Sequence, residues 1–185
     1  MRILLASSEV HPYSKTGGLA DTVGALAKAL AHKGHQVGVV TPLYAGIRER
    51  FPSLKPAGVP LEFSLGPRRV CAQTLSLEPI PGLTVYFIDQ PAFYQRADLY
   101  QEAGADYPDN AERFIFFSKT VAHLALHLPW QPEVLHLHDW QASPAALLLH
   151  HERKLRGQGT TPGICLTIHN LAYQGLFPAT QYALT

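Results

Sequence analysis

The sequence contains little cysteine and little methionine, with two and one of them in 185 residues. The two cysteines, Cys71 and Cys165, lie far apart in the chain. So few cysteines exclude the disulfide framework that stabilises many small secreted domains. We predict instead two buried thiols in a protein of a reducing compartment.

Strong net charge is also missing. The formal net charge is +1 and only 16% of the residues are charged, so no excess of positive charge indicates a nucleic-acid partner. No run approaches the ~18 consecutive apolar residues of a membrane span, and the apolar run at the N-terminus is too short for a secretory signal. We therefore predict a cytoplasmic protein that binds neither nucleic acid nor membrane.

What the chain does contain is a strand–turn–helix pattern at its start. The apolar run 3–6 predicts a buried strand, and the spacing of apolar residues over 19–32 predicts a helix. Lys15, Gly17 and Gly18 lie between them. Because backbone N–H groups and the helix dipole at such a turn favour an anion, we predict a phosphate-bearing ligand. A plainer interpretation stays open, in which the glycines only permit a tight turn and the lysine is only exposed.

Strands and helices continue to alternate along the chain. The alternation predicts an α/β fold, a doubly wound, Rossmann-like, mostly parallel sheet with helices on both faces. Three short strands in the middle, separated by turn residues, predict an antiparallel insertion. The segment 90–108 has no clear period and is a candidate functional loop. The other predicted elements are strands at 37–41, 61–65, 69–77, 83–89, 134–137 and 164–168, a helix at 109–127 capped by Asp109, and a helix at 140–155 with Leu147–Leu149 buried.

Polar residues follow three of these strands at their carboxyl ends, where ligands gather in sheets of this kind. They are the Lys15–Gly18 turn, the run His136–Trp140 and the pair His169–Asn170. Because the strands are predicted to be parallel, we expect the three clusters to meet around one hollow. Structural interpretations stay open, with the histidines as hydrogen-bonded core residues and Asp139 as a helix cap.

Two other classes of enzyme fit the residues less well. A dinucleotide-dependent oxidoreductase needs a G-x-G-x-x-G turn and an acidic residue at the end of the second strand, and the sequence shows neither. His136, His138, His169 and Asp139 are residue types that bind zinc, but no H-E-x-x-H helix accompanies them. A metal-dependent hydrolase that uses the three histidines therefore stays open as the weaker alternative.

Four runs of residues carry a resemblance to a known family. They are Lys15–Asp21, Tyr107–Phe114, His138–Trp140 and His169–Gly175. In this order they resemble bacterial glycogen synthases and plant starch synthases, over almost the whole chain. The resemblance implies a retaining glucosyltransferase of the two-domain GT-B architecture, which transfers glucose from ADP-glucose to the non-reducing end of an α-1,4-glucan such as glycogen.

The resemblance also implies the roles of individual residues. Lys15, Gly17 and Gly18 would bind the phosphates of the donor. Asp139 and His169 would be the catalytic residues around the transferred glucose. Since cations of the protein neutralise the leaving phosphate in this family, the resemblance implies neither a metal nor a cofactor.

Three further residues are implied in binding sugar or acceptor. Asp21 would lie near the acceptor end, Asn170 would contact the sugar, and Tyr94 in the 90–108 segment would contact the growing glucan. One position departs from the family pattern, because Gln141 stands where members commonly have a histidine.

The resemblance further implies that residues 1–185 form a single N-terminal, acceptor-side domain, and that the C-terminal nucleotide-binding domain is absent and is itself an expected partner. We predict that the chain folds alone but transfers glucose weakly or not at all. A non-catalytic α-glucan-binding module and, more weakly, a GT-B enzyme with another sugar donor stay open. The preference for ADP-glucose over UDP-glucose depends on the absent domain.

Overall fold

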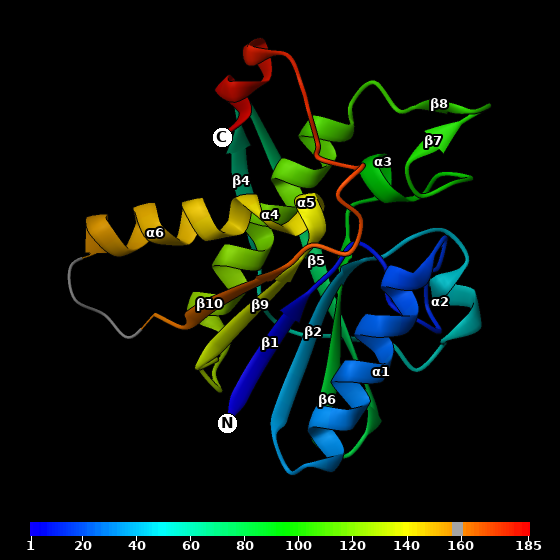
Figure 1. Cartoon of the computed structure of the whole chain (residues 1–185), viewed down its shortest axis with the longest axis vertical. Helices are drawn as coiled ribbons and strands as arrows, with labels where there is room; N and C mark the ends of the chain where they lie inside the picture. Colours follow the sequence, from blue (N-terminus) through cyan, green and yellow to red (C-terminus); the bar gives the residue numbers. More distant parts are fainter. Residues whose placement is uncertain (157–160) are drawn as a thin grey trace.

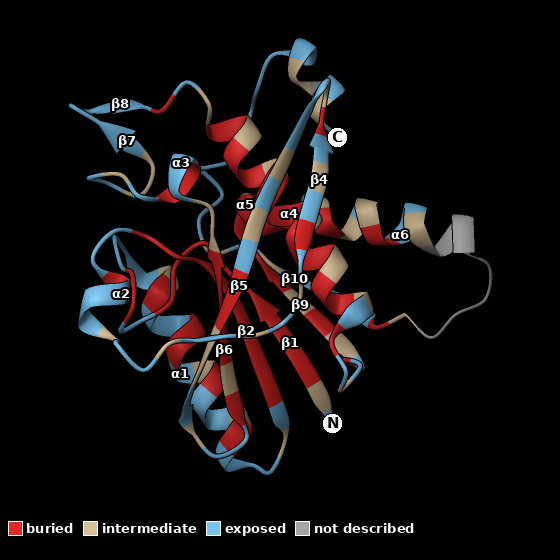
Figure 2. Cartoon of the chain, turned by 180° about the vertical axis from the view of Figure 1, so that it is seen from behind, coloured by how far each residue is buried: buried red, intermediate tan, exposed pale blue. Residues whose placement is uncertain are grey.

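The computed structural model describes residues 1–156 and 161–185, and its centre is one sheet with helices on both faces (Figures 1 and 2). The sheet has eight strands. From one edge to the other they are β10 (Gly163–Thr167), β9 (Val134–His138), β1 (Arg2–Ala6), β2 (Gln36–Pro42), β6 (Leu83–Asp89), β5 (Arg68–Ile80) and β3 (Lys55–Pro56), with β4 (Leu61–Leu65) paired to β5 beside this path.

The strands from β10 to β6 run parallel, and β5 then reverses the direction. The chain passes from β1 through α1 (Gly18–His32) to β2, and it returns after β6 through α4 (Asn110–His127) to β9, on the other side of β1. The two helices cover opposite faces of the sheet (Figures 1 and 2). The direction of connection therefore reverses between β1 and β9, and in open α/β sheets ligands bind at the carboxyl ends of the strands at such a point.

The parallel strands are apolar because both of their faces are covered. Leu4 and Leu5 of β1 and Val39 and Val40 of β2 have no exposed surface. Figure 2 shows these strands as a buried band through the centre of the sheet. The doubly wound, mostly parallel sheet predicted from the sequence is confirmed, and so is the antiparallel pairing of β4, β5 and β6.

The helix predicted at 140–155 is in fact two helices, α5 (Asp139–Ala142) and α6 (Pro144–Arg156). Pro144 has no N–H to donate to the preceding turn, although Ser143 before it keeps helical backbone angles, with φ −58° and ψ −34°. The helix therefore breaks at Ser143 and starts again at Pro144, the first position of a helix, where proline is well tolerated.

Three side chains predicted to be buried are exposed, namely Leu147, Cys71 and Cys165. Leu147 lies on the outer face of α6 and is 63% exposed. Cys165 lies on β10, which is an edge strand with β9 as its partner, and Cys71 lies where β5 extends beyond β6 and pairs with β4. The prediction of two buried thiols was wrong, because composition does not show which strands lie at an edge.

The segment before α4 was predicted as a loop and contains three short elements: α3 (Pro91–Tyr94), β7 (Gln101–Glu102) and β8 (Ala105–Asp106). Asp109 precedes α4, as predicted, but its side chain makes no cap hydrogen bond. Its carboxylate instead accepts two hydrogen bonds from Arg96, at 2.7 and 2.5 Å. Asp109 thus lies at the predicted cap position, but the cap hydrogen bond is missing because Arg96 takes the carboxylate oxygens.

Two short elements complete the chain, α2 (Ile47–Arg50) and the 3-10 helix η1 (Ala179–Leu184). Within the described ranges, none of the helices combines the length and the hydrophobicity that a membrane crossing needs.

Candidate functional site

The glycine turn lies between β1 and the N-terminus of α1 (Figure 1). Gly17 precedes the helix with φ −149°, and Gly18 is its first residue. A side chain added at either position would meet no atom within 4 Å. The fold itself therefore does not require glycine here, and the missing side chains leave the backbone open to a ligand. Binding of phosphate at this turn stays a prediction.

Glu9 is a residue of the site that the sequence interpretation missed. It is 3% exposed, and its carboxylate accepts hydrogen bonds from the backbone N–H and the hydroxyl of Thr16, from the N–H of Gly17 at 3.3 Å and from the hydroxyl of Tyr100 at 2.8 Å. An internal anion thus already occupies the inner N–H groups of the turn. Only the outer side of the turn, where the N–H of Gly18 lies, stays open to a ligand.

Lys15 and Asp21 lie together on the surface beside the turn. The ammonium group of Lys15 donates to Oδ2 of Asp21 at 2.6 Å, and the two side chains are 49% and 52% exposed. Exposed ion pairs contribute little to stability, because water and salt screen them. An incoming anion can therefore compete with Asp21 for the ammonium group.

A second cluster lies at the carboxyl ends of β9 and β10. Nδ1 of His138 and Nε2 of His169 are 2.9 Å apart, and Oδ1 of Asp139 accepts a hydrogen bond from the backbone N–H of His169 at 2.7 Å. Asp139 has φ +58°, an uncommon conformation that turns the chain sharply from β9 into α5. Its carboxylate bridges to His169, just past the end of β10, and does not cap the helix, since the residue at the cap position is His138.

His136 packs against His138 on the same face of β9, with the ring centroids 4.2 Å apart. Nε2 of His136 lies 2.7 Å from the hydroxyl of Thr167, which is the structural role considered for this histidine. Burial lowers the pKa of His136, and burial followed by the neighbouring His136 and His169 lowers the pKa of His138 to about 3. Both rings of β9 are therefore neutral at pH 7.

The three histidines do not converge as metal ligands do. In residues 1–156 and 161–185, no group of three His, Cys, Asp or Glu side chains is arranged to hold a metal ion. The nitrogens of His138 and His169 face each other, and His136 bonds to a threonine, whereas zinc ligands point at one common centre. This geometry gives the metal-dependent hydrolase no support.

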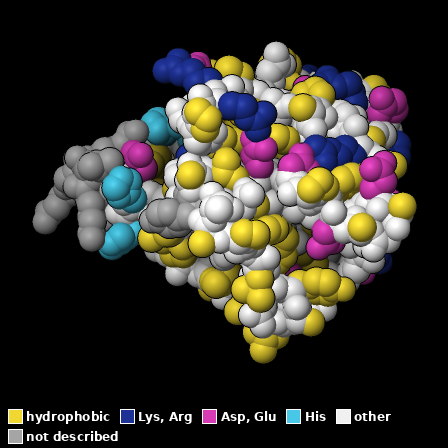
Figure 3. Space-filling model, turned by 90° about the horizontal axis from the view of Figure 1, so that it is seen from above, with side chains coloured by type: hydrophobic (Ala, Val, Ile, Leu, Met, Phe, Trp, Pro, Cys, Tyr) yellow, Lys and Arg dark blue, Asp and Glu magenta, His cyan; other side chains and the backbone are white. Residues whose placement is uncertain are grey.

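The glycine turn and the Asp139–His169 cluster lie at the same edge of the sheet. The turn follows β1, the cluster follows β9 and β10, and these three strands are parallel neighbours. Both therefore border the point between β1 and β9 where the connections reverse (Figure 1). Figure 3 views the molecule from above this edge, and it shows hydrophobic side chains gathered on this face, with charged side chains of both signs among them.

Two residues predicted to bind sugar or acceptor differ in their placement. Tyr94 has no exposed surface, and its hydroxyl donates to the backbone carbonyl of Arg113 at 3.0 Å, so the prediction that it contacts a glucan is wrong for this structure. Asn170 is exposed and accepts from the N–H of Ala172 at 3.0 Å, and its contact with sugar stays a prediction. Gln141, the departure from the family pattern, is 7% exposed and lies inside the protein.

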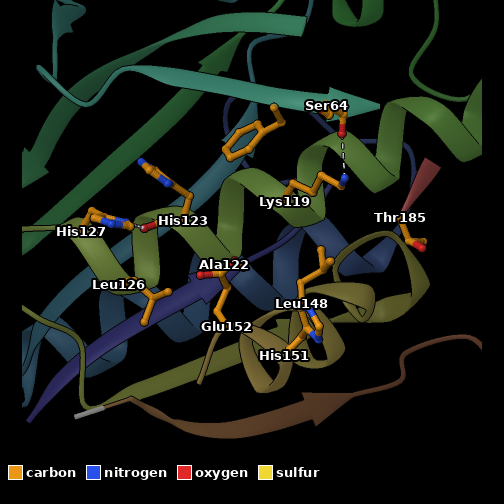
Figure 4. Close-up of a pocket in the computed structure, with 11 residues that line it drawn as sticks. Ser64, Lys119, Ala122, His123, Leu126, His127, Leu148, His151, Glu152 and Thr185 are labelled. Carbon is orange, nitrogen blue, oxygen red and sulfur yellow. Dashed lines mark hydrogen bonds between the residues drawn. The ribbon is translucent and has the colours of Figure 1, made fainter. Parts of the chain in front are cut away.

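A separate pocket of about 260 Å³ lies between α4, α6 and β4 (Figure 4). His123 and His151 line it together with Lys119, whose ammonium group donates to the carbonyl of Ser64 at 2.7 Å. No residue predicted to bind donor, sugar or acceptor lines this pocket. We assign it no ligand.

Acid should destabilise the protein through His138. In the unfolded chain this ring has a pKa of about 6.5, whereas in the fold it is about 3, so between these values the unfolded state binds more protons. The folded protein therefore has its full stability with respect to His138 above pH 6.5, and it loses stability as the pH falls towards 3. From pH 6 to 5, the free energy of unfolding should fall by roughly 1.2 kcal/mol more than in His138→Asn. Urea denaturation across this interval measures the difference.

The matched control for this pH dependence of the unfolding free energy is His150→Gln. His150 is exposed on α6, so its replacement should leave the pH dependence of the unfolding free energy unchanged. An equal fall of the unfolding free energy between pH 6 and 5 in the parent and in His138→Asn would contradict the assignment of a neutral, buried His138.

A comparison of the chain with models of known protein families decides which family it belongs to. The model of the starch synthase catalytic domain matches residues 2–185. The chain belongs to the starch synthase catalytic domain family. The resemblance to glycogen and starch synthases found in the sequence is thereby confirmed.

Members of the starch synthase catalytic domain family resemble the chain along nearly its full length. The glycogen synthase of Anaeromyxobacter dehalogenans is 44% identical over 179 residues, which is 96% of this chain and 36% of that protein. The glycogen synthase of Syntrophotalea carbinolica is 41% identical over 185 residues, which is 99% of this chain and 38% of that protein. The chain thus spans little more than a third of the relatives it matches.

A solved structure of the same family supports the fold. The catalytic domain of starch synthase IV from Arabidopsis thaliana, bound to ADP and acarbose, matches with a TM-score of 0.78 and 29% identity, over 98% of this chain and 36% of that one. The mostly parallel α/β sheet is that of the N-terminal domain of a GT-B glycosyltransferase.

Proposed function

We propose that this chain is the N-terminal, acceptor-side domain of a glycogen synthase that transfers glucose from ADP-glucose to the non-reducing end of an α-1,4-glucan with retention. The observation that carries the proposal is the meeting of two kinds of chemistry at one sheet edge. An open glycine turn beside Lys15 suits a phosphate, and Asp139 with His169 suits the hydroxyls of a sugar. A sugar nucleotide combines both.

Lys15 and the N–H of Gly18 are the proposed ligands of the donor phosphates. Glu9 already accepts the N–H of Gly17, so Gly18 is the next donor along the turn. Lys15 would exchange the carboxylate of Asp21 for phosphate, which leaves Asp21 free to face the acceptor. Because positive charge of the protein would neutralise the leaving phosphate, we propose neither a metal nor a cofactor.

Asp139 and His169 are the proposed catalytic residues at the transferred glucose. Positive charge develops at the anomeric carbon in an oxocarbenium-like transition state. Asp139 is 9% exposed, and a charge in a site of low dielectric stabilises an opposite charge more strongly than in water. Asn170, exposed beside His169, is the proposed contact with a sugar hydroxyl.

Residues outside this chain would complete the active site. The chain spans 36% of the Anaeromyxobacter glycogen synthase, and we propose that a second, C-terminal domain binds the nucleotide base and supplies further cations. That domain is the proposed partner, and without it the chain should transfer glucose weakly or not at all. The Arabidopsis relative, which is bound to ADP, supports ADP as the nucleotide.

A fusion of this chain to the remainder of the Anaeromyxobacter enzyme tests the proposal. The fusion should transfer glucose from ADP-glucose to glycogen, and the chain alone should not. Lys15→Ala should lower kcat/KM of the fusion about 100-fold, because a cation at the leaving phosphate is lost. Initial rates at varied ADP-glucose measure the effect.

Lys28→Ala provides the matched control, since Lys28 is an exposed lysine of α1 and should be dispensable. A Lys15→Ala fusion as active as the parent would remove Lys15 from the donor site. A parent fusion that sediments with glycogen but transfers no glucose would favour the glucan-binding module over the enzyme.

A further inference from the structure

The contact between His138 and His169 is unusual because it joins two imidazole rings, one from the last residue of β9 and one from just past the end of β10. Nδ1 of His138 lies 2.9 Å from Nε2 of His169, and the rings are inclined by 29°. His138 pairs with Thr167, the last residue of β10, and His169 follows two residues later, just past the end of the strand. The register of β9 and β10 therefore brings the two residues close together.

A hydrogen bond between these nitrogens needs one proton. At a pH at which both rings are neutral, His138 carries the proton on Nδ1 and donates to His169, or His169 carries it on Nε2 and donates to His138. In the first arrangement, the second nitrogen of His138 is a bare acceptor and His169 has its own proton on Nδ1. In the second, Nε2 of His138 carries an N–H.

The surroundings of His138 distinguish the two arrangements. The residue is 1% exposed, and its Nε2 has no hydrogen-bond partner in the part of the chain that the structure describes. A buried N–H without an acceptor is rarer and more costly than an acceptor without a donor. His136 packs against this ring at a tilt and already directs its own Nε2 to Thr167. The first arrangement is therefore favoured.

We propose that His138 is a positioning residue, which donates its Nδ1 proton to Nε2 of His169 and so holds His169 with its own proton on Nδ1. The backbone of His169 is held separately, by the carboxylate of Asp139 at 2.7 Å. Both the place of His169 and the identity of its donor nitrogen are thus set where β9 passes into α5, at His138 and Asp139. The catalytic consequence of this inference rests on the proposed function, which places His169 at the transferred glucose. There the Nδ1–H of His169 would donate to an oxygen of the sugar.

The tautomer of His169 can be observed directly in the chain itself. With ¹⁵N-labelled histidine at pH 8, long-range proton–nitrogen correlation spectra separate protonated from bare ring nitrogens. We expect His169 to be protonated on Nδ1 and His138 also on Nδ1. His169 protonated on Nε2 in the parent chain would overturn the proposal, and this outcome needs no variant to fold.

Variants of His138 test whether this residue sets the tautomer. His138→Phe keeps a ring but removes the donor, and His169 should then populate the Nε2-protonated form. His138→Asn retains an N–H near the position of Nδ1 and should retain the Nδ1-protonated form of His169. The matched control is His136→Gln, which leaves the contact in place and should not change the spectrum of His169. An unchanged tautomer in His138→Phe would contradict the proposal.

The fusion enzyme tests the consequence for catalysis. Loss of one fixed hydrogen bond in the His138→Phe fusion should lower kcat/KM about 10-fold, with His138→Asn closer to the parent. Because the tautomer is read without substrate, an inactive parent fusion would count against the proposed function and leave the assignment of His138 standing. Equal losses in the Phe and Asn variants would overturn the positioning role.

Discussion

Replacing Arg113 with methionine should lower the free energy of unfolding by about 3–5 kcal/mol. Arg113 has no exposed surface. Its guanidinium donates to the carbonyl of Phe93 at 2.7 Å, to Oδ1 of Asn110 at 2.7 Å and to the carbonyl of Leu99 at 3.0 Å. Methionine keeps most of the packing volume but leaves three acceptors without these donors. Urea denaturation of the chain at neutral pH measures the loss.

The control for Arg113 is an arginine on the surface. Arg69 has a 79% exposed side chain and pairs with Glu62 at 2.7 Å. Arg69→Met should change the unfolding free energy by less than about 0.5 kcal/mol. A similarly small change for Arg113→Met would show that the segment between α3 and α4 does not depend on this buried cation.

Asp139→Asn should lower kcat of the fusion enzyme about 100- to 1,000-fold and leave the fold intact. Asparagine adopts a left-handed backbone well, which suits φ +58° at this position. Its Oδ1 can still accept the N–H of His169, so the substitution removes little besides the negative charge. The loss should appear in kcat more than in KM, because the charge interacts with the transition state and not with neutral glucose.

Two measurements make the Asp139 result decisive. Urea denaturation of the chain should place Asp139→Asn within about 1 kcal/mol of the parent. Glu78→Gln, the same change of charge at an exposed position of β5, should leave kcat unchanged. An Asp139→Asn fusion with kcat close to the parent's would exclude a catalytic role for this carboxylate.

The parts of the fold and the site that could be predicted are those that nearby residues determine. Apolar strands, the helical spacing of α1 and the polar residues after β9 and β10 are local patterns, and parallel strands bring their carboxyl ends to one edge. Pro144 was a local signal as well, and it should have placed the break before α6. The glycine turn was predictable for the same reason.

Contacts between distant segments were not predictable. Tyr100 donates to Glu9 across 91 positions of the sequence, so the occupant of the glycine turn could not be read from the turn itself. An acidic residue three positions after the first strand was the one signal available for Glu9. Tyr94 was assigned to the glucan because it lies in an irregular segment, but α3 directs its ring into the core beside Arg113.

The carboxylate of Glu9 has a consequence for how tightly a ligand can be held. With Glu9 bonded to Thr16, Gly17 and Tyr100, the loop is ordered before any ligand arrives. The entropy cost of ordering these residues is therefore part of the folding free energy, and it does not weaken the binding of a ligand. A phosphate group would meet the N–H of Gly18 already in place at the turn, and its affinity there would reflect the contact itself.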